Sequence, residues 1–253
     1  MIDLIRAELL KLRTTRMVYG FLGGLLVIVG IIVVVTIIDT PASDLAREED
    51  QAGVYGGAAT GIIFMILLGV MIMSGEFRHG TITQTLLITP NRWKVLAAKV
   101  VASAIAGFAI GVIAELFTFV LFLPLLAIKG VDIVFEDEAR SFVIGSILAT
   151  ALFGPLGVAV GSLMRNQVAA IIVVFATLLI VEPIVSGVME GRGGTWEEIP
   201  KYFPGHLIGG VIGDSSNALS RGASVAVMVA YVLVLSALGG RFVLQRDVNS
   251  IQA

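Results

Sequence analysis

Two carboxylates lie within long apolar runs of the sequence, where an ionisable side chain is unusual. Glu115 lies past the middle of one run, and Glu182 precedes Pro183 late in another. Acids within a membrane span are costly, and they commonly line a polar path or pair with a base. Both acids also have a structural explanation, because Glu115 can bond a neighbouring Ser or Thr and Glu182 can mark a frayed outer helix end. As intramembrane polar sites, they favour one candidate function, a proton- or ion-coupled secondary transporter.

No catalytic or nucleotide-binding motif accompanies these acids. The chain has neither a Gly-x-x-x-x-Gly-Lys-Ser/Thr phosphate loop nor a His-Glu-x-x-His helix. It contains no cysteine, which excludes disulfides and thiolate metal sites, and His79 and His206 fall in different loops. We therefore expect no catalytic residue, no metal site, no cofactor in this chain and no nucleic-acid partner.

The elements that position these residues must be membrane helices. Hydrophobic residues make up 57% of the 253 positions and charged residues only 14%, which is more apolar than a soluble domain requires. Runs of about 20 apolar residues must satisfy their backbone polar groups internally, so they form helices. We expect an all-α membrane protein with one transmembrane domain over residues 1–253. The six predicted spans cover residues 18–38, 54–74, 100–128, 141–164, 168–189 and 223–244.

The chain begins with an amphipathic segment, residues 1–17. The apolar set at helical spacing is Ile2, Ile5, Leu9 and Leu12, and the polar set on the other face is Arg6, Glu8, Lys11 and Arg13. This pattern predicts an interfacial helix on the inner leaflet. A signal peptide is the alternative, but the next apolar run is long enough to span and no small-x-small cleavage site follows it.

A polar and basic segment, Ser74 to Lys99, separates the second predicted span from the third. Its charged and histidine residues are Glu76, Arg78, His79, Arg92, Lys94 and Lys99. We predict a short helix between Gly80 and Thr89, since Gly75 and Gly80 break the preceding span and Pro90 stops the helix. Thr81 or Thr83 can cap this helix, and its apolar face comprises Ile82, Leu86, Leu87 and Ile88. Such a face can dock on another protein, although a solvated connection between spans has the same spacing and composition.

Charge in the connecting loops predicts the orientation. If both termini, Ser74–Lys99 and Arg165 share one side, that side carries eleven Lys/Arg against four acids, and the other side six against thirteen. The positive-inside rule then places both termini in the cytoplasm. The outer acids gather in Asp39–Gln51 and Asp132–Glu138 and lack the spacing of a calcium loop, so we read them as solvated surface. The third outer segment, Glu190–Arg221, is broken by Gly and Pro and predicts short re-entrant or interfacial helices.

Three stretches resemble ABC-2 type transporter permeases. The segment GEFRHGTITQTLLITPNRWKVLAAK is similar to the loop between the second and third spans of that family, with its Gly-Glu, Arg, Gly-Thr, Leu pair, Pro and Arg in order. Residues Leu152–Ile172 are similar to the end of the fourth span and the turn after it. The closing GGRFVLQRDVNS is similar to the tail of actinobacterial-type members.

The resemblance implies the membrane-spanning permease subunit of an ATP-driven exporter in the bacterial cytoplasmic membrane. Two copies of a separate ATPase, which carries ATP and Mg, and a second permease chain, identical or a sister, are the implied partners. The implied coupling residues are Glu76, Arg78, Gly80, Thr81, Thr85, Leu86, Leu87, Pro90 and Arg92, and the implied elbow residues are Glu8, Lys11 and Arg13. Glu76 and Arg78 would hold the loop to the elbow or to the turn near Arg165. The apolar spans suit an amphipathic or lipid-like cargo such as a drug, a peptide antibiotic or a lipid.

Overall fold

The computed structural model describes residues 1–164, 166–213 and 218–242. All regular structure in these residues is helical, and six helical segments are long and apolar enough to cross a membrane. They are α2 (Arg16–Asp39), η1 with α5 (Gly57–Thr60 and Gly61–Arg78), α7 (Arg92–Lys129), α8 (Asp137–Leu163), α9 with η2 and α10 (Gln167–Ala176, Thr177–Val181 and Glu182–Glu190), and α12 (Arg221–Phe242). The predicted all-α membrane fold is confirmed.

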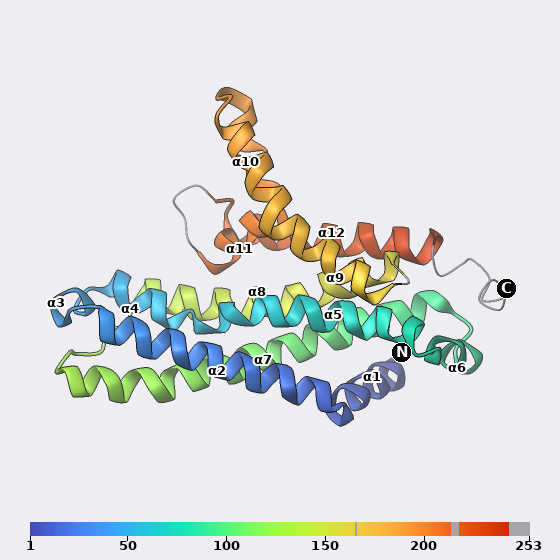
Figure 1. Ribbon diagram of the computed structural model, residues 1–253, viewed down its shortest axis with the longest axis horizontal. Coiled ribbons are helices and arrows are strands. Elements are labelled where there is room, and N and C mark those ends of the chain that lie inside the picture. Colours follow the sequence, from blue (N-terminus) through green and yellow to red (C-terminus); the bar gives the residue numbers. More distant parts are fainter. Residues whose placement is uncertain (165, 214–217, 243–253) are drawn as a thin grey trace.

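The core of the molecule is a lengthwise bundle in which α2, α5, α7 and α8 run side by side (Figure 1). Helix α8 packs closely on α5, because both helices carry glycine at the contact. A Cβ atom added at Gly157 would lie 2.1 Å from the Ile66 carbonyl oxygen, and one at Gly69 would lie 2.1 Å from the Gly154 carbonyl oxygen. Only glycine allows backbones to approach this closely. At Gly20, by contrast, an added Cβ atom would have nothing within 4 Å.

Short helices lie at the two ends of this bundle. Helix α1 (Ile2–Thr14) is separated from α2 by the extended backbone of Thr15, which forms the predicted elbow. Helix α6 (Thr81–Ile88) lies at the same end as α1 (Figure 1). At the opposite end lie α3 (Ala42–Leu45) and α4 (Glu48–Tyr55). The chain therefore gathers its elbow and its central loop at one end of the molecule.

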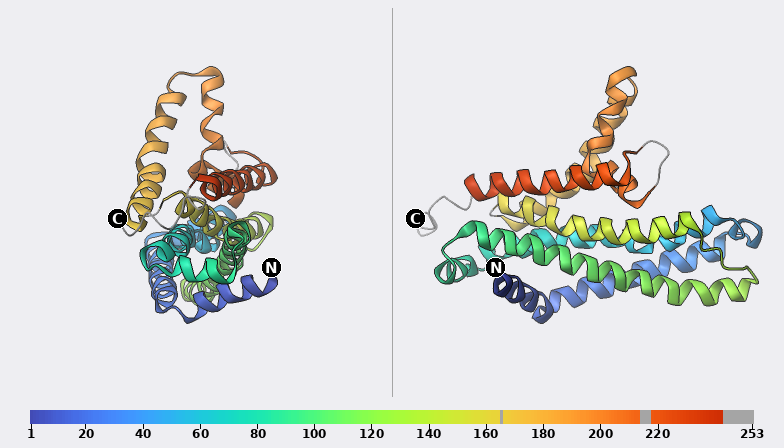
Figure 2. Two further views of the ribbon diagram at one scale, coloured as in Figure 1. Left: turned by 90° about the vertical axis from the view of Figure 1, so that its right-hand side faces the viewer. Right: turned by 180° about the vertical axis from the view of Figure 1, so that it is seen from behind.

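The fifth apolar segment leaves the bundle. Figures 1 and 2 show α10 projecting away from the other helices, after α9 has started beside them. The segment turns away from the bundle after η2, a π-helical segment in which the Glu182 N–H donates to the Thr177 carbonyl, five residues back. Pro183 comes next and has no N–H to continue the ordinary α-helical pattern. The fifth apolar segment is thus irregular in the middle of its span.

Three short helices connect α10 to α12: η3 (Gly194–Glu198), η4 (Pro200–Tyr202) and α11 (Pro204–Ile212). Helix α11 packs on α8 and α12, with Leu207 and Val211 fully buried. The sequence predicted short helical pieces here because Gly and Pro interrupt the apolar pattern.

One predicted break near the central loop is wrong. Gly75 does not break the helix of the second span, because α5 continues through it to Arg78. Helix α7, which contains the predicted third span, begins at Arg92, and the Asn91 side chain caps it by accepting a hydrogen bond from the Lys94 N–H. A glycine inside a helix costs about 1 kcal/mol, which tertiary packing can offset.

The acidic loops that are predicted to lie outside show no metal-binding arrangement in the part of the chain that the structure describes. No group of three or more His, Asp or Glu side chains there is placed to hold an ion.

Candidate functional site

Helix α6 is bounded by its flanking glycine and proline. Gly80 has a φ of 68°, a left-handed conformation that glycine adopts without strain, and it occupies the N-cap position. Neither Thr81 nor Thr83 caps the helix, contrary to expectation, because the N-cap residue makes no side-chain bond and Thr81 is already helical. The Thr85 hydroxyl donates back to the Thr81 carbonyl, and the helix ends at Ile88, before Pro90.

Some apolar residues of α6 face the bundle and others face away from it. Ile82 is buried and Leu86 is half-buried, so these two side chains fix the helix to the bundle. Leu87 and Ile88 are 78% and 85% exposed. An adjacent exposed pair of this kind, at the end of a short helix, forms a small apolar surface at the tip of the molecule.

A buried ionic cluster joins three elements beside α6. The Lys99 ammonium of α7 donates to Glu8 Oε2 of α1 at 2.8 Å and to Glu76 Oε1 of α5 at 2.7 Å. Lys11 Nζ, also of α1, lies 2.7 Å from Glu8 Oε1 and 3.0 Å from Glu76 Oε1. Lys99 is only 1% exposed, and both carboxylates are buried. We call these four groups the elbow cluster. They tie α1 to α5 and α7, at the ends of those two helices that are predicted to lie nearer the cytoplasm.

Charge balance explains how these groups tolerate burial. Two carboxylates face two ammonium groups, and buried charges are stable only when paired and hydrogen-bonded. Burial raises the pKa of Glu8, but the nearby Lys99 charge and the hydrogen bonds from Lys11 and Lys99 outweigh it, and the pKa falls below its ordinary value. Burial likewise lowers the pKa of Lys11, and its bonds to Glu8 and Glu76 outweigh this effect and raise the pKa. Both shifts favour the charged forms of Glu8 and Lys11 at neutral pH.

The cluster corrects the predicted orientation of the elbow helix. Glu8 was expected on the polar face, away from the apolar one, and instead it points into the protein. Its helical neighbours Leu4, Ile5, Leu9 and Leu12 are half-buried around it. The role of Lys99 was missed, although its spacing carries a signal: Val95 and Leu96, one turn earlier on α7, are both buried. Lys99 thus falls on the inward face of that helix.

The remaining coupling and elbow candidates lie outside this cluster. Arg13 and Arg78 are exposed and Arg92 is half-buried, and none of the three has an ion pair within the described residues. Glu76 contacts the elbow, which is one of the two partners expected for it. The other, the turn at Arg165, lies outside the described residues.

Beside the elbow cluster is a cavity of about 850 Å³. It is lined by residues of α1, α2, α5 and α6 together with Lys99 and the buried Gln167 of α9. Residues 4–181, more than half of the chain, match the family model described as ABC-2 family transporter protein.

The chain belongs to the ABC-2 transporter family. A comparison with curated proteins found no match. As an ABC-2 protein it is a non-catalytic, multi-pass membrane subunit of a transporter, and in this family ATP is bound by a partner ATPase. The matched residues include most of α1, all of α6 and the whole elbow cluster, and they end at Val181, immediately before Glu182.

The two intramembrane acids of this ABC-2 protein have separate surroundings. Glu115 Oε2 accepts a hydrogen bond from the Ala58 N–H at 3.1 Å and one from the Ser146 hydroxyl at 3.4 Å. Glu182 Oε2 accepts one from the Gly205 N–H at 2.7 Å. Within the described residues these bonds have no member in common, so they form no relay between the two acids. Glu182 is 5% exposed at the start of α10, which is not the frayed end that the sequence suggested.

Proposed function

We propose that this ABC-2 protein is the membrane-spanning half of an ATP-driven exporter of an amphipathic or lipid-like cargo. The observation that carries the proposal is the exposed Leu87–Ile88 pair on α6, beside an elbow that is bonded to α5 and α7. A separate ATPase would bind this pair, and two ATPase copies would serve two permease chains. The second permease would be identical or a sister chain.

The elbow cluster supports a route by which movement of α6 reaches the spans. Helix α6 connects α5 to α7 directly, and Glu76 and Lys99 lie on those two spans. Their bonds to Glu8 and Lys11 extend the unit to α1. A push on α6 would therefore move α1, α5 and α7 together rather than bend one loop. ATP would drive the change only if the ATPase pair binds the outward-facing state more tightly than the inward-facing one.

The proposed placement follows from loop charge and family order. Both termini and α6 would face the cytoplasm of a bacterial cell, since that side carries the excess of Lys and Arg. Residues 1–253 would act as one transmembrane domain, with the second and fifth spans lining the path. The actinobacterial-type tail, Arg246 to Ser250, supports the subtype, and these residues lie outside the described part of the chain.

Co-purification with the ATPase tests the proposal. The ATPase to use is the product of a neighbouring gene that encodes a phosphate-binding Walker loop, co-expressed with the full permease. Leu87→Asp should weaken association by roughly a hundredfold, because an unpaired charge in a desolvated contact costs about 3 kcal/mol. Ile133→Asp is the matched control, since Ile133 is an exposed apolar residue in the loop at the other end of the molecule. Equal recovery of the ATPase with both variants would refute the docking role of α6.

A further inference from the structure

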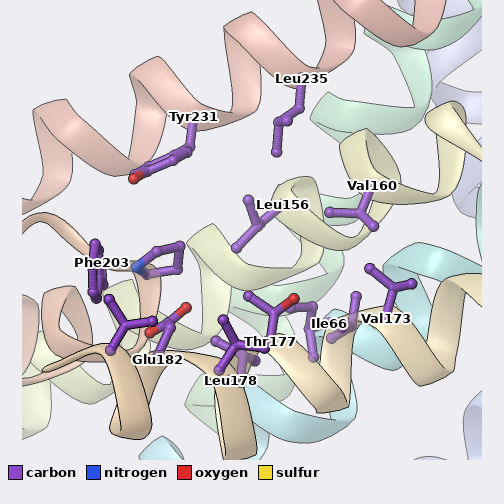
Figure 3. Close-up of a pocket in the computed structure, with 14 residues that line it drawn as sticks. Ile66, Leu156, Val160, Val173, Thr177, Leu178, Glu182, Phe203, Tyr231 and Leu235 are labelled. Atoms are coloured by element: carbon purple, nitrogen blue, oxygen red, sulfur yellow. The ribbon is translucent and has the colours of Figure 1, made fainter. Parts of the chain in front are cut away.

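A second cavity lies between the irregular fifth segment and α12. Its volume is about 350 Å³, within the usual range for small-ligand sites. Val160 of α8, Leu178 of η2 and Leu235 of α12 contribute aliphatic side chains to its wall, and Phe203 and Tyr231 contribute aromatic rings. Figure 3 shows these side chains converging from facing helices, with Glu182 among them. The interior is therefore apolar except at a few points.

Among the residues that the structure describes, Glu182 is the only Asp, Glu, His, Lys or Arg that lines this cavity. One of its carboxylate oxygens, Oε2, accepts the Gly205 N–H at the start of α11. The other, Oε1, is buried and has no hydrogen-bond partner among the described residues. No Lys or Arg in that part of the chain forms an ion pair with Glu182. A buried carboxylate with a free oxygen is costly unless a donor reaches that oxygen, and a positively charged donor forms the strongest hydrogen bond to it.

The backbone around Glu182 is shaped to hold the carboxylate in place. A Cβ atom added at Gly205 would lie 2.5 Å from Glu182 Oε2, so a larger residue would displace the carboxylate. The π-helical turn ends at Val181, and Thr177, Leu178 and Val181 of this turn all line the cavity. Single π-helical turns occur often at functional sites because they reorient the side chains around them.

We propose that this cavity binds a cationic amphiphile, with its ammonium group on Glu182 Oε1 and its aliphatic body against Val160, Leu178 and Leu235. A protonated amine supplies both the charge and the hydrogen that the free oxygen lacks, whereas an alcohol supplies only the hydrogen. The inference deepens the proposed export function by giving its cargo a positive charge. The binding site itself does not depend on ATPase coupling. An amphiphilic amine and an aminophospholipid both carry this chemistry.

Photolabelling of the purified full-length permease tests the site without an ATPase. The probe is decylammonium with a diazirine in mid-chain, and the comparison probe is the corresponding decanol. We expect the ammonium probe to label peptides containing Tyr231 or Leu235, and Glu182→Gln or Gly205→Ala to reduce this labelling at least tenfold. Glu115→Gln is the matched control, because Glu115 is an equally buried acid that does not line the cavity. Competition by dodecylamine or by short-chain phosphatidylethanolamine distinguishes the two sources of the ammonium group.

Variants that fill the cavity keep the test decisive if Glu182→Gln fails to fold. Val160→Phe should reduce labelling by both probes, since it removes space and not charge. Equal labelling of wild type and Glu182→Gln would overturn the proposal, and so would equal labelling by the ammonium and alcohol probes. Either result would leave ATPase association through α6 untouched, so failure here is distinct from failure of the export function.

Discussion

Replacing Lys99 by methionine tests the elbow cluster most severely. Methionine keeps the length of the side chain and removes the ammonium that Glu8 and Glu76 share at 2.8 and 2.7 Å. The cluster then holds two buried carboxylates and one ammonium, Lys11, which is half exposed. Removing one partner of a buried ion pair costs about 3–5 kcal/mol. We expect the lower end of this range, because Lys11 can still approach both acids.

A double variant separates the lost charge from lost packing. Lys99→Met combined with Glu76→Gln leaves a charge-balanced Glu8–Lys11 pair, so it should be more stable than Lys99→Met alone by about 0.5–3 kcal/mol, the usual range of coupling energies for groups in contact. Lys94→Met is the control, since Lys94 is exposed on the same helix and lies outside the cluster. Chemical unfolding in mixed micelles measures the purified wild type, the Lys94→Met control, the double variant and both of its single variants, Lys99→Met and Glu76→Gln.

The reasoning fails if the single variant loses less than about 1 kcal/mol, which is typical of an exposed pair. It also fails if the two substitutions add independently, because additivity means that the lysine and the glutamate do not interact.

Three further predictions concern pH, packing and topology. The pKa of Glu8 is lowered and that of Lys11 is raised. Unfolding scans should therefore show that the cluster's stabilisation is lost only below pH 4.5, as Glu8 is protonated, and above pH 10.5, as Lys11 loses its proton. A loss near pH 7 would contradict this. Gly157→Ala should destabilise the protein by several kcal/mol, roughly the cost of overpacking a core, while Gly20→Ala, with open space around it, should be nearly neutral in the same unfolding assay. Reporter fusions after Gln51, Asp137 and Glu198 should report the outside, and those at Thr89 and Ala253 the inside; an internal Glu198 reporter would overturn the six-span orientation.

The architecture could be predicted because the membrane restricts it. An apolar run of about 20 residues has to form a helix, whatever it packs against. The six spans therefore follow from composition, and Pro90 and Gly80 bound α6 through local backbone preferences alone. The predicted end of α5 at Gly75 was wrong, because burial of the surrounding helix easily offsets the cost of about 1 kcal/mol for a glycine inside it.

The interior of the site could not be predicted from local pattern. Helical spacing separates two faces of α1 but does not say that the polar Glu8 faces inward, because that choice depends on a lysine ninety-one positions away. The cavity at Glu182 likewise depends on Gly205 and on two helices distant in sequence. The π-helical turn beside it has no signal except Pro183.

Site-specific cross-linking from α6 to the ATPase tests the central claim most directly. The chain contains no cysteine, so a single cysteine placed at Ile88 carries a benzophenone label at one site only. With the co-expressed Walker-loop ATPase, the account predicts a permease–ATPase cross-link from position 88, and none from a cysteine placed at Ile133, which is also exposed but lies at the other end of the molecule. Absence of a cross-link from position 88, or equal cross-linking from both positions, would contradict the claim that α6 is where the ATPase acts.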